Sequence, residues 1–256
     1  MVRQGFFWLL LVIAGLLAYA ALIEPNWLEC TQHSLAGNLD HTLKVAHLTD
    51  LHLRKVGILE RRVIAAVRSE APDLILVTGD TLDSVASLQV AKEFFGGLSA
   101  PLGIYAVLGN WENWEHFSSV QLFRSFGVNL LINERVNLGN GVSVVGFDDW
   151  LSGQPARVLA TEGSGFCISM IHSPEFFGKD ATHCPLVLAG HTHGGQIRIP
   201  LLGPLWLPPG SGKYVSGWYR SADSALYVSR GTGTSVLPIR FLARPEIAFF
   251  TIGPKQ

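Results

Sequence analysis

Short apolar runs that alternate with helical patterns limit the fold of this chain more than any other feature. Six runs rich in Val, Ile and Leu have the length and composition of buried strands, and they span Leu43–Thr49, Leu74–Thr78, Gly103–Leu108, Val142–Phe147, Phe166–Ile171 and Leu186–Ala189. Apolar residues at helical spacing follow the first three runs, at Ile58–Ser69, Leu88–Leu98 and Glu115–Phe126. This alternation of strands and helices predicts an α/β fold.

The part of the chain after Gly194 has a different pattern. It is rich in Gly and Pro and breaks into hairpin-like pieces, with predicted strands at Tyr214–Tyr219, Ala225–Ser229 and Ile247–Ile252. The sequence contains no internal repeat. We therefore expect one domain over residues 42–256, preceded by a polar tether over residues 24–41.

The N-terminus carries an uncharged apolar segment, Gly5–Ile23. At about 1.5 Å per residue a helix of this length nearly spans a bilayer core of ~30 Å. A signal peptide is the alternative, since Ala18–Ala20 resembles a cleavage site. Because the apolar run continues to Ile23, we expect an uncleaved membrane anchor over residues 1–23. Arg3, the only charged side chain before the segment, favours a domain outside the cytoplasm.

Composition excludes several classes of protein. Hydrophobic residues make up 48% of the chain and charged residues only 15%, against roughly 25% charged in average globular proteins, so the chain is not disordered. The formal net charge of -1 lacks the basic excess that nucleic-acid binding needs. Cys30, Cys167 and Cys184 are widely spaced, so we expect buried or free thiols rather than a disulfide framework or a thiolate zinc site.

Polar residues that can bind metal come directly after five of the predicted strands, where open α/β sheets place their sites. They are Asp50 and His52, Asp80 and Asp83, Asn110 and Glu112, His172, and His191 and His193. Positions two apart in an extended loop project to the same side. Carboxylates, imidazoles and one amide without thiolate suit Mn, Fe or Zn. If Asp80 bridges two ions, each ion receives four protein ligands and keeps room for water and substrate, as two-metal displacement at phosphorus requires.

These motifs, D-x-H, G-D-x-x-D, G-N-x-E, a lone His after a strand and G-H-x-H, resemble the calcineurin-like metallophosphoesterase superfamily. The resemblance implies a four-layer αββα sandwich and hydrolysis of phosphodiester or phosphoanhydride bonds by in-line attack of a metal-bridging hydroxide. It implies two divalent ions, with manganese expected first and iron or zinc as alternatives. The ligands would be Asp50, His52, Asp80 and His193 for one ion, and Asp80, Asn110, His172 and His191 for the other, with Asp80, Asn110 and His191 also counted as catalytic.

Three further segments are similar to a bacterial, membrane-associated branch that includes UDP-2,3-diacylglucosamine pyrophosphatases of lipid A synthesis: His193–Arg198, Lys213–Gly217 and Arg244–Ile247. This likeness implies a single-pass anchor in a bacterial inner membrane, a lipid-linked phosphoanhydride substrate and work at the cytoplasmic face of that membrane. That face conflicts with the orientation that Arg3 favours, so the side of the membrane stays open. The alternatives are a general phosphodiesterase acting on phospholipid or soluble diesters and, more remotely, a metal-free scaffold.

One position departs from the family pattern. The family has His directly after the ligand Asn, where it helps the leaving oxygen, and here Trp111 stands in that place. Trp111 is either an aromatic packed beside Trp114 or the mark of a leaving group that needs little acid help, such as a phosphate monoester leaving an anhydride. Glu112 and His116 are the alternative proton donors.

The remaining candidates keep two interpretations each. Asp83 either orients a ligand His or caps a helix. Five basic residues either hold a substrate phosphate or balance carboxylates, namely Arg198, Lys213, Arg230, Arg240 and Arg244. The Pro-rich apolar stretch Ile197–Pro209 is either a buried loop or an exposed lip that dips into a bilayer.

Overall fold

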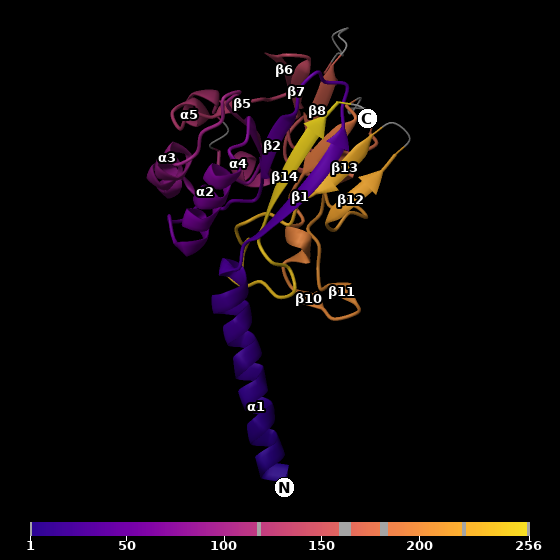
Figure 1. Ribbon diagram of the computed structural model, residues 1–256. Coiled ribbons are helices and arrows are strands. Elements are labelled where there is room, and N and C mark those ends of the chain that lie inside the picture. Colours follow the sequence, from indigo (N-terminus) through magenta and orange to yellow (C-terminus); the bar gives the residue numbers. More distant parts are fainter. Residues whose placement is uncertain (1, 117–118, 159–164, 180–183, 222–223, 255–256) are drawn as a thin grey trace.

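Two six-stranded sheets pack face to face in this computed structural model, which describes residues 2–116, 119–158, 165–179, 184–221 and 224–254 (Figure 1). The first sheet has the order β1-β14-β2-β3-β4-β5, with bounds Glu29–Ala36, Glu246–Gly253, Leu43–Leu48, Leu74–Thr78, Ile104–Val107 and Asn129–Leu130. The second has the order β12-β13-β9-β8-β7-β6, with bounds Gly217–Arg220, Ala225–Val228, Leu186–Ala189, Phe166–Met170, Val142–Gly146 and Glu134–Gly139. The predicted α/β fold is confirmed.

The core between the sheets comes from the runs that the sequence marked as strands. Val45 and Phe250 from the first sheet pack in one apolar cluster with Ile168 and Leu188 from the second. The inner strands β2, β3 and β4 run parallel. Parallel strands covered on both faces are apolar throughout, which explains why these runs show no polar alternation.

Helices cover the outer face of the first sheet. Val63 and Val67 of α2 (Ile58–Glu70) and Phe94 of α3 (Leu88–Gly96) share a cluster with the strands beneath them. Over the second sheet the fourth layer is thin in the described part of the chain. There η4 (Pro174–Phe176) and Tyr214 pack on the outer side chains of the sheet.

Of the helix predicted over Glu115–Phe126, the described residues form only α5 (Val120–Arg124), while α4 (Asn110–Trp114) ends just before that range. His116 adopts a left-handed backbone with φ of 57°, which a continuing α-helix does not allow. Ser119 then caps α5, because its side chain accepts a hydrogen bond from the backbone N–H of Leu122. Residues 117–118, which the predicted helix includes, lie outside the described residues. Of the strand predicted over Tyr214–Tyr219, only the part from Gly217 forms, as β12.

The segment expected to be a tether contains a strand of the first sheet. β1 pairs in parallel with β14 from Glu29 opposite Glu246 to Ala36 opposite Gly253. It is an edge strand whose residues alternate between half-buried and exposed. Its polar composition is therefore that of an edge strand and not that of a flexible linker.

The cysteines also differ from expectation. Cys167 of β8 and Cys184, just before β9, form a disulfide with Cα atoms 4.9 Å apart, whereas Cys30 is free and exposed. Strands β8 and β9 are parallel neighbours, so the fold brings together two cysteines whose spacing in the sequence carried no signal.

The N-terminal segment is a helix that projects away from the domain (Figure 1). α1 (Val2–Ala18) continues through a π-helical turn, η1 (Tyr19–Ile23), and a 3-10 turn, η2 (Glu24–Asn26). The span Gln4–Asn26 is long and apolar enough to cross a membrane and is largely exposed, and a signal sequence near the N-terminus has the same properties.

Candidate metal centre

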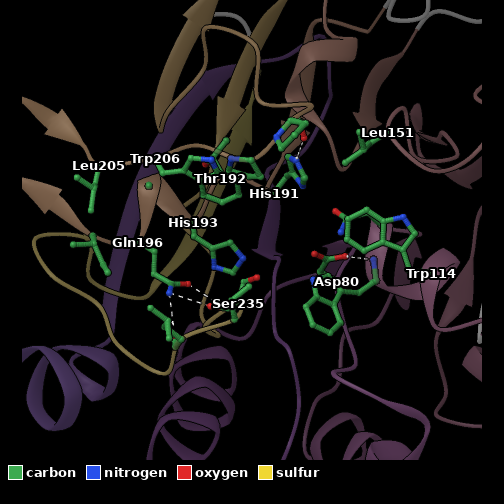
Figure 2. Close-up of a pocket in the computed structure, with 18 residues that line it drawn as sticks. Asp80, Trp114, Leu151, His191, Thr192, His193, Gln196, Leu205, Trp206 and Ser235 are labelled. Atoms are coloured by element: carbon green, nitrogen blue, oxygen red, sulfur yellow. Dashed lines mark hydrogen bonds between the residues drawn. The ribbon is translucent and has the colours of Figure 1, made fainter.

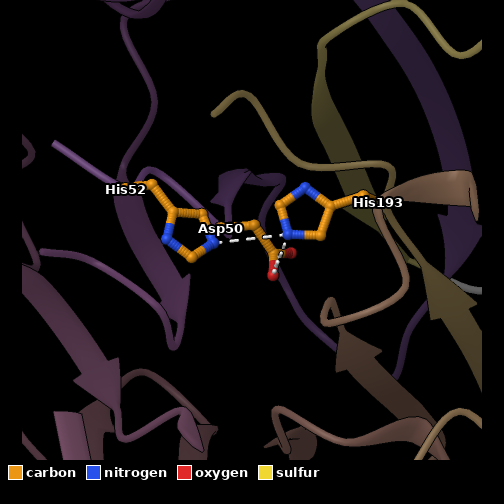
Figure 3. Close-up of side chains that lie close together, drawn as sticks. All are labelled: Asp50, His52 and His193. Atoms are coloured by element: carbon orange, nitrogen blue, oxygen red, sulfur yellow. Dashed lines mark hydrogen bonds and ion pairs between the residues drawn. The ribbon is translucent and has the colours of Figure 1, made fainter. Parts of the chain in front are cut away.

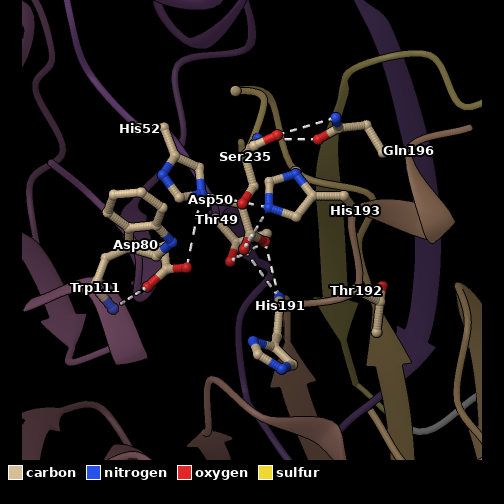
Figure 4. A network of polar contacts seen from close by, with 12 residues as sticks. Thr49, Asp50, His52, Asp80, Trp111, His191, Thr192, His193, Gln196 and Ser235 are labelled. Atoms are coloured by element: carbon tan, nitrogen blue, oxygen red, sulfur yellow. Dashed lines mark hydrogen bonds and ion pairs between the residues drawn. The ribbon is translucent and has the colours of Figure 1, made fainter. Parts of the chain in front are cut away.

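The seven predicted ligands meet at the ends of five strands. Asp50 and His52 follow β2, Asp80 follows β3, Asn110 follows β4, His172 follows β8, and His191 and His193 follow β9. All seven side chains are buried. Figure 4 shows most of this cluster, with the polar side chains of both sheets turned toward one another.

Asp50, His52 and His193 form the first group (Figure 3), with one ligand atom from each lying within 4.8 Å of the others. The Nε2 atoms of His52 and His193 are 3.3 Å apart. His193 Nε2 lies 3.5 Å from Asp50 Oδ1. The backbone N–H of His191 donates to Asp50 Oδ2 at 2.9 Å, which fixes the carboxylate in place.

Asp80, His172 and His191 form the second group, again within 4.8 Å. His172 Nε2 lies 3.4 Å from Asp80 Oδ2 and 3.1 Å from His191 Nδ1. The same nitrogen is 3.1 Å from Asn110 Oδ1, which brings Asn110 to this group. Asp80 Oδ2 also lies 3.6 Å from His52 Nε2 of the first group. Asp80 therefore stands between the two groups, as a bridging carboxylate must.

The protonation states of four ligands suit metal binding, whereas the neighbouring Asp80 outweighs burial and raises the pKa of His172 above its usual range, so His172 must lose a proton to bind an ion. Burial lowers the pKa of His52 to about 4 and that of His191 to about 4, so both imidazoles are neutral and keep a lone pair. Burial opposes ionisation of Asp80, but the neighbouring His172 outweighs it and holds the Asp80 pKa below its usual range. Burial raises the pKa of Asp50 to about 7, and a cation beside it would favour the carboxylate. The donor set fits two buried divalent ions.

Five of the ligand residues have an uncommon, left-handed backbone conformation, which sets the direction of their side chains. Asp50, His52, Asp80, His191 and His193 all have positive φ, between 42° and 72°. Asp and His enter this left-handed region more readily than most residues but still at a cost. Gly109 leaves the room that the turns need, since a Cβ there would lie 2.2 Å from Asp80 Oδ1.

Glu112 holds the two central turns together. Its buried carboxylate accepts hydrogen bonds from three backbone N–H groups, those of Asp80 (3.0 Å), Thr81 (2.6 Å) and Gly109 (2.8 Å). Burial raises its pKa to about 7. Because all three partners are backbone groups, Glu112 orients the Asp80 turn and is not the substitute proton donor considered from the sequence.

Trp111 contacts the ligands directly. Its backbone N–H donates to Asp80 Oδ1 at 3.0 Å, and its ring meets the His52 ring edge-on, with centroids 5.2 Å apart.

Three other candidates from the sequence do not bond to the ligands. Asp83 neither orients a ligand nor caps a helix but pairs with Arg54 at 2.8 Å, and Arg198 donates to the carbonyl oxygen of Gly194 at 3.0 Å. His116 is exposed.

Arg240 has a role at the site that the sequence did not reveal, since nothing there ranked it above the other four basic candidates. It is fully buried, and its Nη2 lies 3.5 Å from His193 Nδ1. The guanidinium also donates to the carbonyl oxygens of Gly231 at 3.1 Å and Ala243 at 2.7 Å. Arg240 therefore ties the loop around His193 together, a role set by carbonyl groups that leave no pattern in the sequence.

A cavity of about 580 Å³ opens onto the ligands (Figure 2). Asp80, Asn110, His191 and His193 form its polar end. Apolar side chains form most of the remaining wall, including Trp111, Trp114, Leu151, Ile197, Leu205, Trp206, Val236 and Leu237. The site thus joins a metal-binding end to an apolar chamber.

Comparison with known proteins agrees with this geometry. Residues 43–195 match the family described as calcineurin-like phosphoesterase, and the chain belongs to this family. The Bacillus subtilis protein YkuE, described as an uncharacterized metallophosphoesterase, is 32% identical over 94% of this chain and 91% of its own length. The phosphodiesterase YaeI of Escherichia coli is 29% identical over 91% of this chain and 92% of its own length. A solved 5'-nucleotidase precursor from Thermus thermophilus has a TM-score of 0.45 and 13% identity, covering 83% of this chain and 54% of that one.

The chain is accordingly a metallophosphoesterase whose two buried ligand groups fit the dinuclear metal site typical of the family. The identity of the metals and the finer likeness to UDP-2,3-diacylglucosamine pyrophosphatases stay predictions.

Proposed function

We propose that this metallophosphoesterase uses two divalent ions, manganese first among them, to hydrolyse a phosphodiester or phosphoanhydride of a lipid-linked substrate. The observation that carries the proposal is the apolar cavity that ends at Asp80, His191 and His193. A phosphate held at that end leaves the rest of the substrate against apolar walls, which favour an amphiphile over a small polar ester.

Each ion has a defined set of residues in this proposal. Asp50, His52, Asp80 and His193 hold one ion, and Asp80, Asn110, His172 and His191 hold the other. The chemistry that two divalent ions would supply there is polarisation of the phosphoryl oxygens and balance of their charge. The chain itself positions the ligands through Glu112 and Arg240 and excludes water from a buried site.

The chemical class of the leaving group is inferred from Trp111, which cannot supply a proton to it. The usual His is replaced, Glu112 is engaged by backbone N–H groups, and His116 is exposed. A phosphate monoester leaves readily without a proton, whereas an alkoxide gains about 10²–10⁴-fold from general acid catalysis. UDP-2,3-diacylglucosamine, cleaved to UMP and the lipid sugar phosphate, is therefore the first candidate substrate.

A phosphodiester of a membrane phospholipid is the second candidate, favoured by the Cys167–Cys184 disulfide. Disulfides persist in oxidising compartments, so this bond and Arg3 both support a domain outside the cytoplasm, away from the cytoplasmic face implied for the lipid A precursor. Alkylating membranes denatured in sodium dodecyl sulfate without reductant should modify Cys30 alone if the bond is present in the cell, and denaturation is needed because Cys167 and Cys184 are buried in the folded chain. Modification of all three cysteines would remove the support for this candidate.

A comparison of rates tests the leaving-group argument. We expect UDP-2,3-diacylglucosamine to be hydrolysed faster than an unactivated alkyl phosphodiester, with manganese added to both. Trp111→His should help the diester more than the anhydride, because only the alkoxide needs a proton. Trp114→His is the matched control, since Trp114 lines the same cavity without bonding to Asp80. Equal wild-type rates on both substrates, or a Trp111→His gain confined to the anhydride, would overturn the assignment.

A further inference from the structure

The segment around β10 (Arg198–Ile199) and β11 (Gly203–Pro204) exposes a group of large apolar side chains. We call residues 199–206 the lip. Leu201 is fully exposed, Leu202 is 80% exposed, and Leu205 and Trp206 are each about two thirds exposed. Contiguous apolar surface of this kind marks contact with a membrane or another protein.

A neighbouring loop extends this surface. Val236 and Leu237 are 78% and 52% exposed. Gln196 connects this loop to the base of the lip, because its Nε2 donates to the carbonyl oxygens of Ser235 (3.1 Å) and Leu237 (2.9 Å). The two loops therefore present one apolar surface.

Charge is nearly absent from this surface. Within residues 197–210 and 234–239, all of which the structure describes, Arg198 is the only charged residue, and it is half-buried with its guanidinium bonded to Gly194. A surface that met an acidic or basic protein partner would carry complementary charge. This one is suited to hydrocarbon.

The position of the N-terminal helix indicates that this hydrocarbon is the lipid of the membrane that the helix would enter. Figure 1 shows β10 and β11 at the same end of the domain as the point where α1 joins it, away from the far ends of the sheets. Leu22 and Ile23 at the end of the apolar helix and Leu242 beside them are exposed and apolar. The backbone N–H of Arg240 donates to the carbonyl oxygen of Ala20 at 2.9 Å, which fixes the helix end beside the loop that carries Val236.

We propose that the lip and residues 236–237 insert into the lipid leaflet at which the N-terminal helix ends, so that the mouth of the cavity opens against lipid. Leu205, Trp206, Val236 and Leu237 are each more than half exposed and also line the cavity. An acyl chain can therefore pass from the leaflet into the cavity along apolar side chains without crossing water. The route of entry rests on the proposed lipid-linked substrate, whereas the insertion itself does not.

A depth measurement on the full-length chain tests the insertion. Leu202→Cys in a Cys30→Ser background is labelled with an environment-sensitive fluorophore and reconstituted into phosphatidylethanolamine and phosphatidylglycerol vesicles with nitroxide-labelled acyl chains. Val120→Cys is the matched control, because Val120 is an exposed apolar residue of α5, at the end of the domain far from α1. We expect strong quenching by the nitroxide lipid at position 202 and none at 120. Equal quenching by aqueous iodide at both positions, with no nitroxide effect, would overturn the proposal.

A rate measurement tests the route of entry. The double substitution Leu201→Ser with Leu202→Ser removes apolar surface outside the cavity lining. We expect several-fold slower hydrolysis of UDP-2,3-diacylglucosamine in vesicles and an unchanged rate on water-soluble bis(p-nitrophenyl) phosphate, with Val120→Ser affecting neither. An unchanged rate on vesicles contradicts the route. If the wild type hydrolyses the soluble diester alone, the proposed substrate fails while the quenching result still decides the insertion.

Discussion

The backbone N–H of Arg240 donates to the carbonyl oxygen of Ala20 at 2.9 Å, which connects the apolar N-terminal helix to the loop beside His193. A second bond runs from the N–H of Ala243 to the buried carboxylate of Glu24 at 2.5 Å. Ala20, at the end of the predicted cleavage site Ala18–Ala20, and Glu24 thus both bond to the domain, and these are contacts that a retained N-terminal segment would keep.

Truncation tests this connection. Removing residues 1–18 should leave the unfolding free energy of the domain close to that of the full chain, because Ala20 and Glu24 remain. Removing residues 1–26 leaves the buried N–H groups of Arg240 and Ala243 without their partners. Each unpaired buried group lowers the unfolding free energy by about 1–3 kcal/mol. Urea unfolding in detergent measures the difference. Equal stability of the two truncations would show that the bonds contribute nothing.

Asp80→Asn should abolish activity and weaken binding of both ions, since Asp80 touches both ligand groups. A loss of at least about 10³-fold in rate is expected when a charge that organises the transition state is removed. Metal content by mass spectrometry and hydrolysis of an activated diester are the measurements. Asp83→Asn is the control, because an exposed ion pair with Arg54 contributes about 1 kcal/mol or less. Wild-type activity in Asp80→Asn would refute the bridging role.

Glu112→Gln should lower metal affinity by about 10–100-fold, as for other residues that orient ligands. The amide has one oxygen for three N–H donors and brings its own N–H₂ toward them, so the Asp80 turn loosens. Titration with Mn²⁺ measures the affinity. Glu115→Gln makes the same change at an exposed position and should bind Mn²⁺ as the wild type does. A wild-type affinity in Glu112→Gln would mean that the three hydrogen bonds accepted by Glu112 are not needed to position Asp80.

His47 should make stability depend on pH. It is fully buried, its Nε2 lies 2.8 Å from Thr78 Oγ1, and burial lowers its pKa from 6.5 to about 3. Between pH 6.5 and about 3, His47 is protonated in the unfolded chain but neutral in the folded chain. The unfolding free energy is therefore unaffected by protonation of His47 above pH 6.5 and decreases as the pH falls toward 3. The slope is about 1.4 kcal/mol per pH unit.

The variant His47→Gln isolates that contribution. In metal-free protein its unfolding free energy should fall less steeply with decreasing pH than that of the wild type, so the difference between the two narrows under acid. His116→Gln, the same change at an exposed position, is the control and should track the wild type. Parallel curves for wild type and His47→Gln would contradict the assignment.

The ligands were predictable because each lies within a few residues of a strand with a strong local pattern. Asp50 and His193 come from different sheets, yet the rule that sites form at strand ends was enough to bring them together. The role of Arg240 was not predictable in the same way, because its partners are backbone carbonyls of a loop without a periodic sequence.

The predictions of the fold that were wrong have similar causes. The predicted tether contains β1 because an edge strand with one exposed and one half-buried face has the composition of a linker. The sequence over Glu115–Phe126 has the apolar spacing of a helix, but the left-handed His116 and the extended Ser119 interrupt it among the described residues. The Cys167–Cys184 bond depends on β8 lying beside β9, which spacing along the chain does not reveal.

The left-handed turns have a consequence for any attempt to stabilise this protein. Asp50, His52, Asp80, His191 and His193 each adopt a conformation that costs a non-glycine residue about 1–2 kcal/mol. Glycine would relieve that strain but would remove the ligand, so folding and chemistry make opposite demands at the same five positions. A library of variants selected for heat resistance alone should accumulate glycine there and lose hydrolysis as it gains melting temperature.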